Sequence, residues 1–237
     1  MTVFGYDAAI VERFPAIVGG IVHARGVRNG STPPALAEAF RLEQSRTLDR
    51  IGSTPLAELP SLTAWRRAFS AFGVEPTRYR SAAESLLRRL TKQGEIPSLS
   101  LLVDLGNLVS IRYGLPVAVC DQRDVSGGTT VRFAGGSERF TDLGTEGTIS
   151  PDPGEVIFVD DAGLVSARRW CWRQSAQSAA KEDTEEILIT VEGLHEGAGT
   201  DVEAAVADLV WLLAEHAPAP STEQGVLTAA RPAFPGA

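Results

Sequence analysis

Four polar residues recur along one apolar segment of the sequence, residues 98–113. Ser100, Asp104, Asn107 and Ser110 follow one another at spacings of three and four, so in a helix they share one narrow face. The other residues are mainly leucine, valine and isoleucine, which predicts a buried helix. A buried carboxylate or amide without a hydrogen bond costs about 1–3 kcal/mol. Two uses of this stripe stay open: a structural network that ties the helix to a loop, which spacing alone favours, or the floor of a pocket.

A second polar cluster ends the apolar run that carries Trp170 and Trp172. In a strand with a period of two residues, these tryptophans and Gln174 face one way, while Arg173 and Ser175 face the other. Paired tryptophans are typical of a core. An arginine followed by Gln and Ser at a strand end is typical of a binding edge, because the guanidinium fork suits a carboxylate or a phosphate.

Charge is unevenly distributed in this chain of 237 residues, which has a net charge of −8. Residues 61–114 hold eight basic and four acidic residues, whereas residues 181–216 hold one basic and ten acidic residues. The basic segment is suited to phosphate, and the acidic segment repels it. Arginines on the polar face of a helix are equally explained by solubility. The candidate RNA-binding residues are Arg78, Arg80, Arg88, Arg89 and Lys92.

Several function classes lack support in the sequence. The hydrophobic fraction of 43% is ordinary for a globular protein, and no apolar run reaches the roughly 20 residues of a membrane span. No basic leader precedes the first acidic residues, and two cysteines cannot form a disulfide framework, so we expect a cytoplasmic protein. Three histidines without ligand spacing, and the absence of GxSxG, GxGxxG and GxxxxGK[ST], predict neither a metal nor a cofactor.

The hydrophobic pattern predicts a mixture of helices and strands. Helices are expected at residues 32–51, with Thr32 as the N-cap, and at 61–72, 81–92, 98–113 and 201–216. Strands are expected at residues 16–27, 117–120, 129–134, 156–159, 164–172 and 186–191. The end of the chain, residues 217–237, is rich in Ala, Pro, Ser and Gly, which predicts a disordered tail.

Several short motifs follow one another in a recognisable order. They are Val103-Asp104-Leu105-Gly106-Asn107-Leu108, Gly114-Leu115-Pro116, Asp121, Gly127, Val131-Arg132-Phe133-Ala134, Glu138, Asp160 and Thr184. This order resembles the B3/B4 domain, the module of the bacterial phenylalanyl-tRNA synthetase β subunit that clears wrongly charged amino acids from tRNA. Free-standing proteins built on this domain are also similar, in the runs 107–110 and 172–175. The resemblance implies an α/β (α+β) fold, a B3/B4-like layered fold with a small mixed sheet packed against helices.

The domain organisation follows from this resemblance, which covers roughly residues 60–195. Residues 1–59 are expected to form an N-terminal strand and helix packed on the same domain. Residues 60–195 form the B3/B4-like domain, residues 196–216 a C-terminal helix, and residues 217–237 the disordered tail.

The sequence departs from the synthetase pattern at four places. Ala118 stands at the position of the synthetase histidine, and Gly106 replaces the threonine before the matched asparagine. Gln174-Ser175 falls on the Gly-Gly pair of the synthetase pocket, and Thr190 falls on its gating glutamate. These changes imply a different bound group. No aminoacylation is expected, because no part of the sequence resembles the catalytic subunit.

The resemblance implies a trans-editing aminoacyl-tRNA deacylase that acts on the aminoacylated 3′ end of tRNA, with no DNA or membrane partner. Asn107 would orient the water or the carbonyl, Asp104 or Glu138 would hold the amino group, and Arg173 with Gln174 would position the terminal ribose or phosphate. A non-catalytic RNA- or small-molecule-binding module stays open as the alternative, and so does the oligomeric state. Eight residues are expected to line one pocket together with Asn107, and Arg173 is expected to pair with a carboxylate when the pocket is empty: Asp104, Asp121, Arg132, Glu138, Trp172, Arg173, Gln174 and Ser175.

Overall fold

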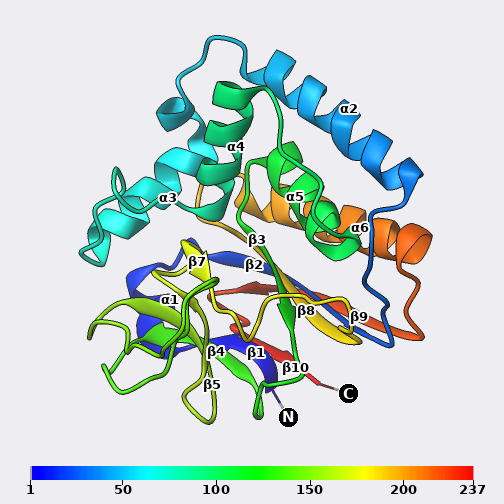
Figure 1. Ribbon diagram of the computed structural model, residues 1–237. Coiled ribbons are helices and arrows are strands. Elements are labelled where there is room, and N and C mark those ends of the chain that lie inside the picture. The colour runs from blue at the N-terminus through cyan, green and yellow to red at the C-terminus, as the bar shows by residue number, and fades with distance from the viewer. Residues whose placement is uncertain (1, 237) are drawn as a thin grey trace.

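Two β-sheets and one layer of helices make up the computed structural model, which describes residues 2–236 (Figure 1). The helices are α1 (Ala8–Arg13), α2 (Pro34–Ile51), α3 (Pro60–Ala71), α4 (Ala82–Gln93), α5 (Leu101–Tyr113) and α6 (Ala198–His216), with a 3₁₀ turn at Leu56–Glu58. The strands are β1 (Thr2–Tyr6), β2 (Val18–Arg25), β3 (Val117–Asp121), β4 (Thr129–Phe133), β5 (Val156–Asp160), β6 (Val165–Arg168), β7 (Arg173–Gln174), β8 (Glu186–Gly193), β9 (Ser221–Thr228) and β10 (Ala233–Pro235). This mixture confirms the predicted α/β fold class.

The four-stranded sheet lies between the helices α2 to α6 and the six-stranded sheet, whereas α1 lies beside the six-stranded sheet (Figure 1). Its strand order is β3-β8-β2-β9, and that of the six-stranded sheet is β10-β1-β4-β5-β6-β7. Within β8, Ile187 and Ile189 pack into the core beneath the helices, while Leu188 packs into the core between the sheets. Both faces of this strand are therefore covered, which explains why residues 187–189 are consecutively apolar rather than alternating with polar residues.

Helix α5 is buried on most of its circumference, as its sequence predicts. Leu102, Leu105 and Leu108 are fully buried. Gly106 lets the helix approach β3 closely, since a Cβ there would lie only 2.9 Å from Val119. The helix consequently fixes the position of β3, which borders the cavity described below.

The strand expected at residues 164–172 ends earlier, at Arg168. The two residues that follow, Arg169 and Trp170, have φ angles of 43° and 60°, which no strand accommodates. Thr32 is not the N-cap of α2, because Pro33 occupies that position and the Thr32 hydroxyl donates to Asp104 instead. The expected strands also divide between two sheets rather than joining in one.

Both ends of the chain contribute more strand than expected. The prediction of disorder at residues 217–237 is wrong for the part that the structure describes, because β9 pairs antiparallel with β2 and β10 pairs antiparallel with β1. Near the N-terminus, β1 also pairs parallel with β4. Residues 2–25 therefore supply one strand to each sheet, β1 to the six-stranded sheet and β2 to the four-stranded sheet. The helices α1 and α2 complete the N-terminal segment.

Candidate functional site

A cavity of about 70 Å³ lies between the two sheets, at the end where β6 turns into β7. The strands β3 and β8 provide one wall, and β5, β6 and β7 provide the other, so the site draws on both sheets. The lining residues are Ala82, Pro116, Val117, Ala118, Phe158, Ala167, Trp170, Cys171, Trp172, Arg173, Gln174, Thr190 and Glu192. Most of these side chains are apolar, so the few polar groups among them decide what binds.

Two polar residues of β8, Thr190 and Glu192, lie on the same face of the strand because they alternate. Each is only 2% exposed. One oxygen of Glu192, Oε1, accepts hydrogen bonds from the Tyr6 hydroxyl at 2.8 Å and from the Trp170 indole nitrogen at 3.0 Å. The side-chain hydrogen bonds among residues 2–236 include none to the other oxygen, Oε2, and none with the Thr190 hydroxyl. Buried polar groups are ordinarily satisfied, so this pair has capacity for a ligand or a water molecule.

Burial raises the pKa of Glu192 from its ordinary value of 4.5 to about 7, and the hydrogen bonds from Trp170 and Tyr6 oppose this rise. A carboxyl group with such a pKa exchanges its proton near neutral pH, which suits it to a role in binding or proton transfer. Burial also raises the pKa of the neighbouring Cys171 thiol well above its ordinary value. Cys171 therefore stays protonated and is a poor nucleophile.

The backbone around Trp170 is strained in order to place its indole. Arg169 and Trp170 both adopt left-handed conformations, which cost on the order of 1–3 kcal/mol at residues other than glycine. The Trp170 N–H donates to the Val156 carbonyl, and Arg169 pairs with Glu155 at 2.8 Å. These contacts hold the turn, and strained turns of this kind concentrate at functional sites.

Three of the eight predicted pocket residues, Trp172, Arg173 and Gln174, line the cavity. The side chain of Arg173 is 43% exposed, and its guanidinium lies 2.8 Å from a carboxylate oxygen of Asp142, so the expected carboxylate partner is confirmed. The Gln174 amide donates to backbone carbonyls, including that of Val119 at 2.8 Å, and thereby ties the β6–β7 turn to β3.

The remaining predicted pocket residues belong to local networks of their own and are not among the residues that line this cavity. Ser175 is buried, and its hydroxyl donates to Ser178 at 3.0 Å. Asp104 accepts hydrogen bonds from the Thr32 hydroxyl at 2.6 Å, from the Leu99 N–H at 2.9 Å and from the Ser98 hydroxyl. Of the two uses open to the stripe on α5, this carboxylate performs the structural one.

Asp121 and Glu138 are carboxylates that hold turns together. Burial raises the pKa of Asp121, but hydrogen bonds from Arg123 and Thr184 outweigh it and leave this pKa below its ordinary value. Glu138 accepts from the backbone of the Gly135–Gly136 turn and pairs with Arg132 at 2.5 Å. Burial opposes these bonds, yet they lower the pKa of Glu138 to about 2. Neither the Asp121–Arg123 pair nor the Glu138–Arg132 pair is among the residues that line the cavity.

Asn107, the predicted catalytic residue, lies on α5 and is not among the residues that line the cavity. Its side chain makes no hydrogen bond within the part of the chain that the structure describes. Its catalytic role stays a prediction and has no place in this cavity. The sequence pattern missed Glu192, Tyr6 and Trp170, and the only signal for Glu192 was an acidic residue inside an apolar strand.

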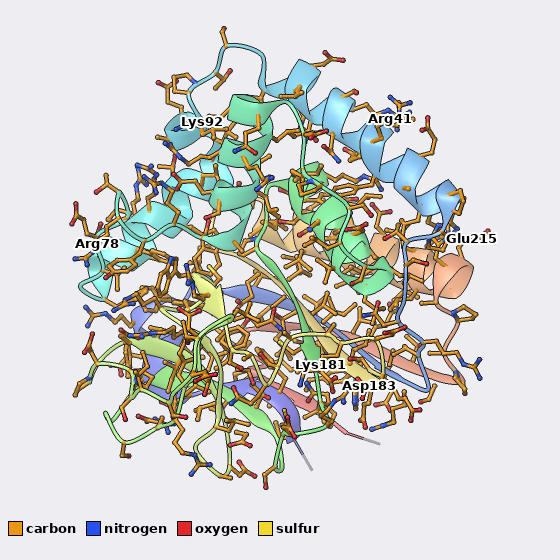
Figure 2. All side chains as sticks on the ribbon, viewed as in Figure 1. Arg41, Arg78, Lys92, Lys181, Asp183 and Glu215 are labelled. Atoms are coloured by element: carbon orange, nitrogen blue, oxygen red, sulfur yellow. The ribbon has the colours of Figure 1, made fainter. Side chains whose placement is uncertain are left out.

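The predicted RNA-binding residues lie on α4 and on the loop that precedes it. Figure 2 shows Arg78 at the left edge of the molecule, by the end of α3, and Lys92 near the top, at the end of α4. Arg80 lies 3.6 Å from a carboxylate oxygen of Glu84, whereas no ion pair involves Arg78, Arg88, Arg89 or Lys92 among residues 2–236. Their role in RNA binding stays a prediction.

Residues 2–236 lack two further kinds of feature, a metal-binding cluster and a membrane-spanning helix. No three or more His, Cys, Asp or Glu side chains gather there in a way that could hold a metal ion. Among the helices of the same residues, none has the length and hydropathy that crossing a membrane requires.

Comparison with known proteins identifies relatives of this chain. A family model described as the B3/4 domain matches residues 64–204. A phenylalanine–tRNA ligase β subunit from Neisseria meningitidis serogroup A is 26% identical over 151 residues, which are 64% of this chain and 19% of that protein. The corresponding subunit from Streptomyces avermitilis is 38% identical over 81 residues, 34% of this chain and 9% of that protein. The chain thus spans about a fifth or less of the length of these relatives.

One solved structure covers most of the chain. It is an N-terminal fragment of the phenylalanyl-tRNA synthetase β subunit from Pyrococcus horikoshii, with 14% sequence identity and a TM-score of 0.45. The match covers 95% of this chain and 50% of that fragment.

Proposed function

The chain belongs to the B3/4 domain family, and we propose from this premise that it hydrolyses mischarged aminoacyl-tRNA in the cavity between its two sheets. One observation carries the proposal: Thr190 and Glu192 have unused hydrogen-bonding capacity inside the cavity, and Arg173 stands at its more exposed side. A ligand that fits places an amine and a carbonyl in the cavity, near Glu192 and Thr190, and an anionic group at the exposed side, near Arg173. An amino acid esterified to the end of a nucleic acid has this polarity.

Each polar group then has a role in the reaction. Glu192 receives the α-ammonium group, and the Thr190 hydroxyl donates to the ester carbonyl oxygen and polarises it. Water adds to the carbonyl carbon, the bond from that carbon to the ribose oxygen breaks, and the ribose oxygen takes up a proton. The products are a free amino acid and tRNA. Arg173 exchanges its surface partner Asp142 for the terminal ribose phosphate, because an exposed ion pair is weak.

The size of the cavity supports a small aminoacyl group. A water molecule needs about 10–15 Å³ of cavity, so 70 Å³ holds roughly five to seven groups of that size. Phe158, Trp170 and Trp172 fill the space that an aromatic substrate side chain would need. A cytoplasmic location is part of the same proposal, because aminoacyl-tRNA is used there.

A second candidate function is a module that binds the same group without hydrolysing it. The raised pKa of Cys171 favours this alternative, because it removes the one thiol that lines the cavity as a nucleophile. Deacylation differs from binding in its product, so a chemical assay separates the two.

The experiment is a deacylation screen of the purified chain against tRNAs mischarged with each of a panel of amino acids. We expect hydrolysis of a small aminoacyl group, lost in Thr190→Val and in Glu192→Gln and kept in Arg41→Ala. Arg41 serves as the control because it lies on α2, in an exposed pair with Glu38, distant from the cavity (Figure 2). Folded protein that hydrolyses none of the panel would establish the binding alternative. Hydrolysis that survives both cavity variants would place the reaction elsewhere.

A further inference from the structure

Arginine and aromatic side chains form one continuous stack beside the cavity. The guanidinium carbon of Arg78 lies 5.1 Å from the ring centre of Tyr79, and that of Arg169 lies 4.1 Å from the same ring. Arg169 is also 5.0 Å from the Trp172 ring, and Arg173 is 4.7 Å from it. The two rings meet edge to face, with 4.9 Å between their centres. Each of these contacts is within the range of a cation–π interaction or an aromatic pair.

The middle of the stack is buried and held in place, whereas the arginines at its two ends are exposed. Arg169 is only 12% exposed, pairs with Glu155 and belongs to the strained turn. Arg78, in contrast, is exposed and makes no ion pair within residues 2–236. At the other end, Arg173 is 43% exposed, and its one carboxylate partner is Asp142 at the surface. Two exposed guanidinium planes are therefore held on a rigid aromatic support.

The stack connects two hollows in the surface. Trp172 and Arg173 line the cavity, while Arg78, Tyr79 and Arg169 line a neighbouring open groove of about 340 Å³. Figure 2 shows Arg78 at the left edge of the molecule, by the end of α3. A chain that lay in the groove with its last residue in the cavity would cross both ends of the stack.

We propose that this stack binds the unpaired 3′-terminal nucleotides of an RNA, with their bases against the exposed guanidinium planes of Arg78 and Arg173. This inference rests on the proposed function, since it supplies the path by which an aminoacylated end reaches the cavity. Unpaired bases stack on aromatic rings and guanidinium planes whatever their sequence, and the arginine charges pair with the phosphates. Arg78 shares its groove with Glu75, Asp152 and Glu155 but makes no ion pair within residues 2–236, so its contribution is the more direct one.

Carboxylates near the stack weaken its binding to RNA. Asp142 pairs with Arg173, and Asp152 lies 3.4 Å from Arg169. These carboxylates compete with phosphate, and the chain as a whole carries a charge of −8. Binding is therefore weak and transient, as a deacylase that must release each tRNA requires.

The test compares two unacylated RNA hairpins, one with a single-stranded CCA 3′ overhang and one blunt, by fluorescence anisotropy of a labelled 5′ end. We expect the overhang to bind more tightly, and Arg78→Ala to weaken its binding about tenfold, with little effect on the blunt hairpin. Arg78→Lys keeps the charge and loses the planar surface, so it should lose most of the preference for the overhang. Arg41→Ala is the matched surface control (Figure 2).

Equal binding of the two hairpins, or equal effects of Arg78→Ala and Arg41→Ala, would overturn the inference. Tyr79→Phe provides a second variant, because it keeps the ring that supports Arg78 and should keep the overhang preference. Unacylated RNA makes the result independent of hydrolysis. Deacylation without a role for Arg78 removes only this inference, while an Arg78-dependent overhang preference without deacylation removes only the proposed enzyme.

Discussion

The indole nitrogen of Trp170 donates to the same oxygen of Glu192 that receives the hydroxyl of Tyr6. Trp170 belongs to the strained turn after β6, Glu192 to β8 in the other sheet, and Tyr6 to β1 near the start of the chain. Tyr6 lies outside residues 64–204, which the family model matches. The polar centre of the cavity is thus completed by a strand from outside the matched region.

The raised pKa of Glu192 makes the stability of the protein depend on pH. Between pH 4.5 and about 7, the folded protein keeps a proton that the unfolded chain releases, so the free energy of unfolding falls by about 3 kcal/mol as pH rises. Below pH 4.5 the group is protonated in both the folded and the unfolded state, so the free energy of unfolding no longer changes with pH through Glu192. We expect Glu192→Gln to be more stable than the wild type at pH 8, with a gap that shrinks towards pH 4. Urea unfolding at several pH values measures this gap.

The matched control for that variant is Glu155→Gln. Glu155 is also buried, but it pairs with both Arg168 and Arg169. Its neutralisation leaves the buried guanidinium of Arg168 without its carboxylate partner, which costs about 3–5 kcal/mol. The two substitutions should therefore change stability in opposite directions at pH 8. A loss of stability in both variants would contradict the prediction for Glu192.

A glycine in β2 makes room for the hydroxyl that binds Glu192. A Cβ at Gly19 would lie 2.1 Å from the Tyr6 hydroxyl oxygen and 3.0 Å from the ring carbon that carries it. We expect Gly19→Ala to destabilise the protein by about 1–3 kcal/mol, because the ring must move. Tyr6→Phe removes the obstructing oxygen, so the double variant should lose less stability than the sum of the two single variants. A cycle of unfolding free energies measures this coupling, and strict additivity would refute it.

The sequence predicted the elements better than the site, for physical reasons that particular residues make clear. The apolar runs of α5 and β8 identify buried elements, because burial requires them whatever their neighbours are. The partners of a buried polar residue depend on tertiary contacts instead. Asp104 meets Thr32 across 72 positions of sequence, and Glu192 meets Tyr6 across 186. No spacing within one segment encodes such a pair.

Variants of Asp104 and Asn107 test whether the polar stripe on α5 has a structural role or a catalytic one. Asp104→Ala removes the acceptor of three hydrogen bonds, and we expect a loss of about 3 kcal/mol in the free energy of unfolding. Asn107→Ala removes no side-chain hydrogen bond within residues 2–236, so its melting temperature should stay near that of the wild type. Its deacylation rate then tests the catalytic prediction directly. An Asp104→Ala protein as stable as the wild type would show that this network contributes little.

The C-terminal strands looked disordered in sequence because their small and polar residues bury little surface of their own. Their order comes from pairing: Leu227 of β9 lies opposite Gly19 of β2, and only 1% of its surface is exposed. We expect Leu227→Ala to cost about 2–5 kcal/mol, as other large-to-small substitutions in a core do. The exposed neighbour Thr228 supplies the control, since Thr228→Ala should change stability by less than about 0.5 kcal/mol.

Because β2 also borders Tyr6 through Gly19, Leu227→Ala should shift the titration of Glu192 as well. Equal melting temperatures for the two variants would mean that β9 does not support the sheet.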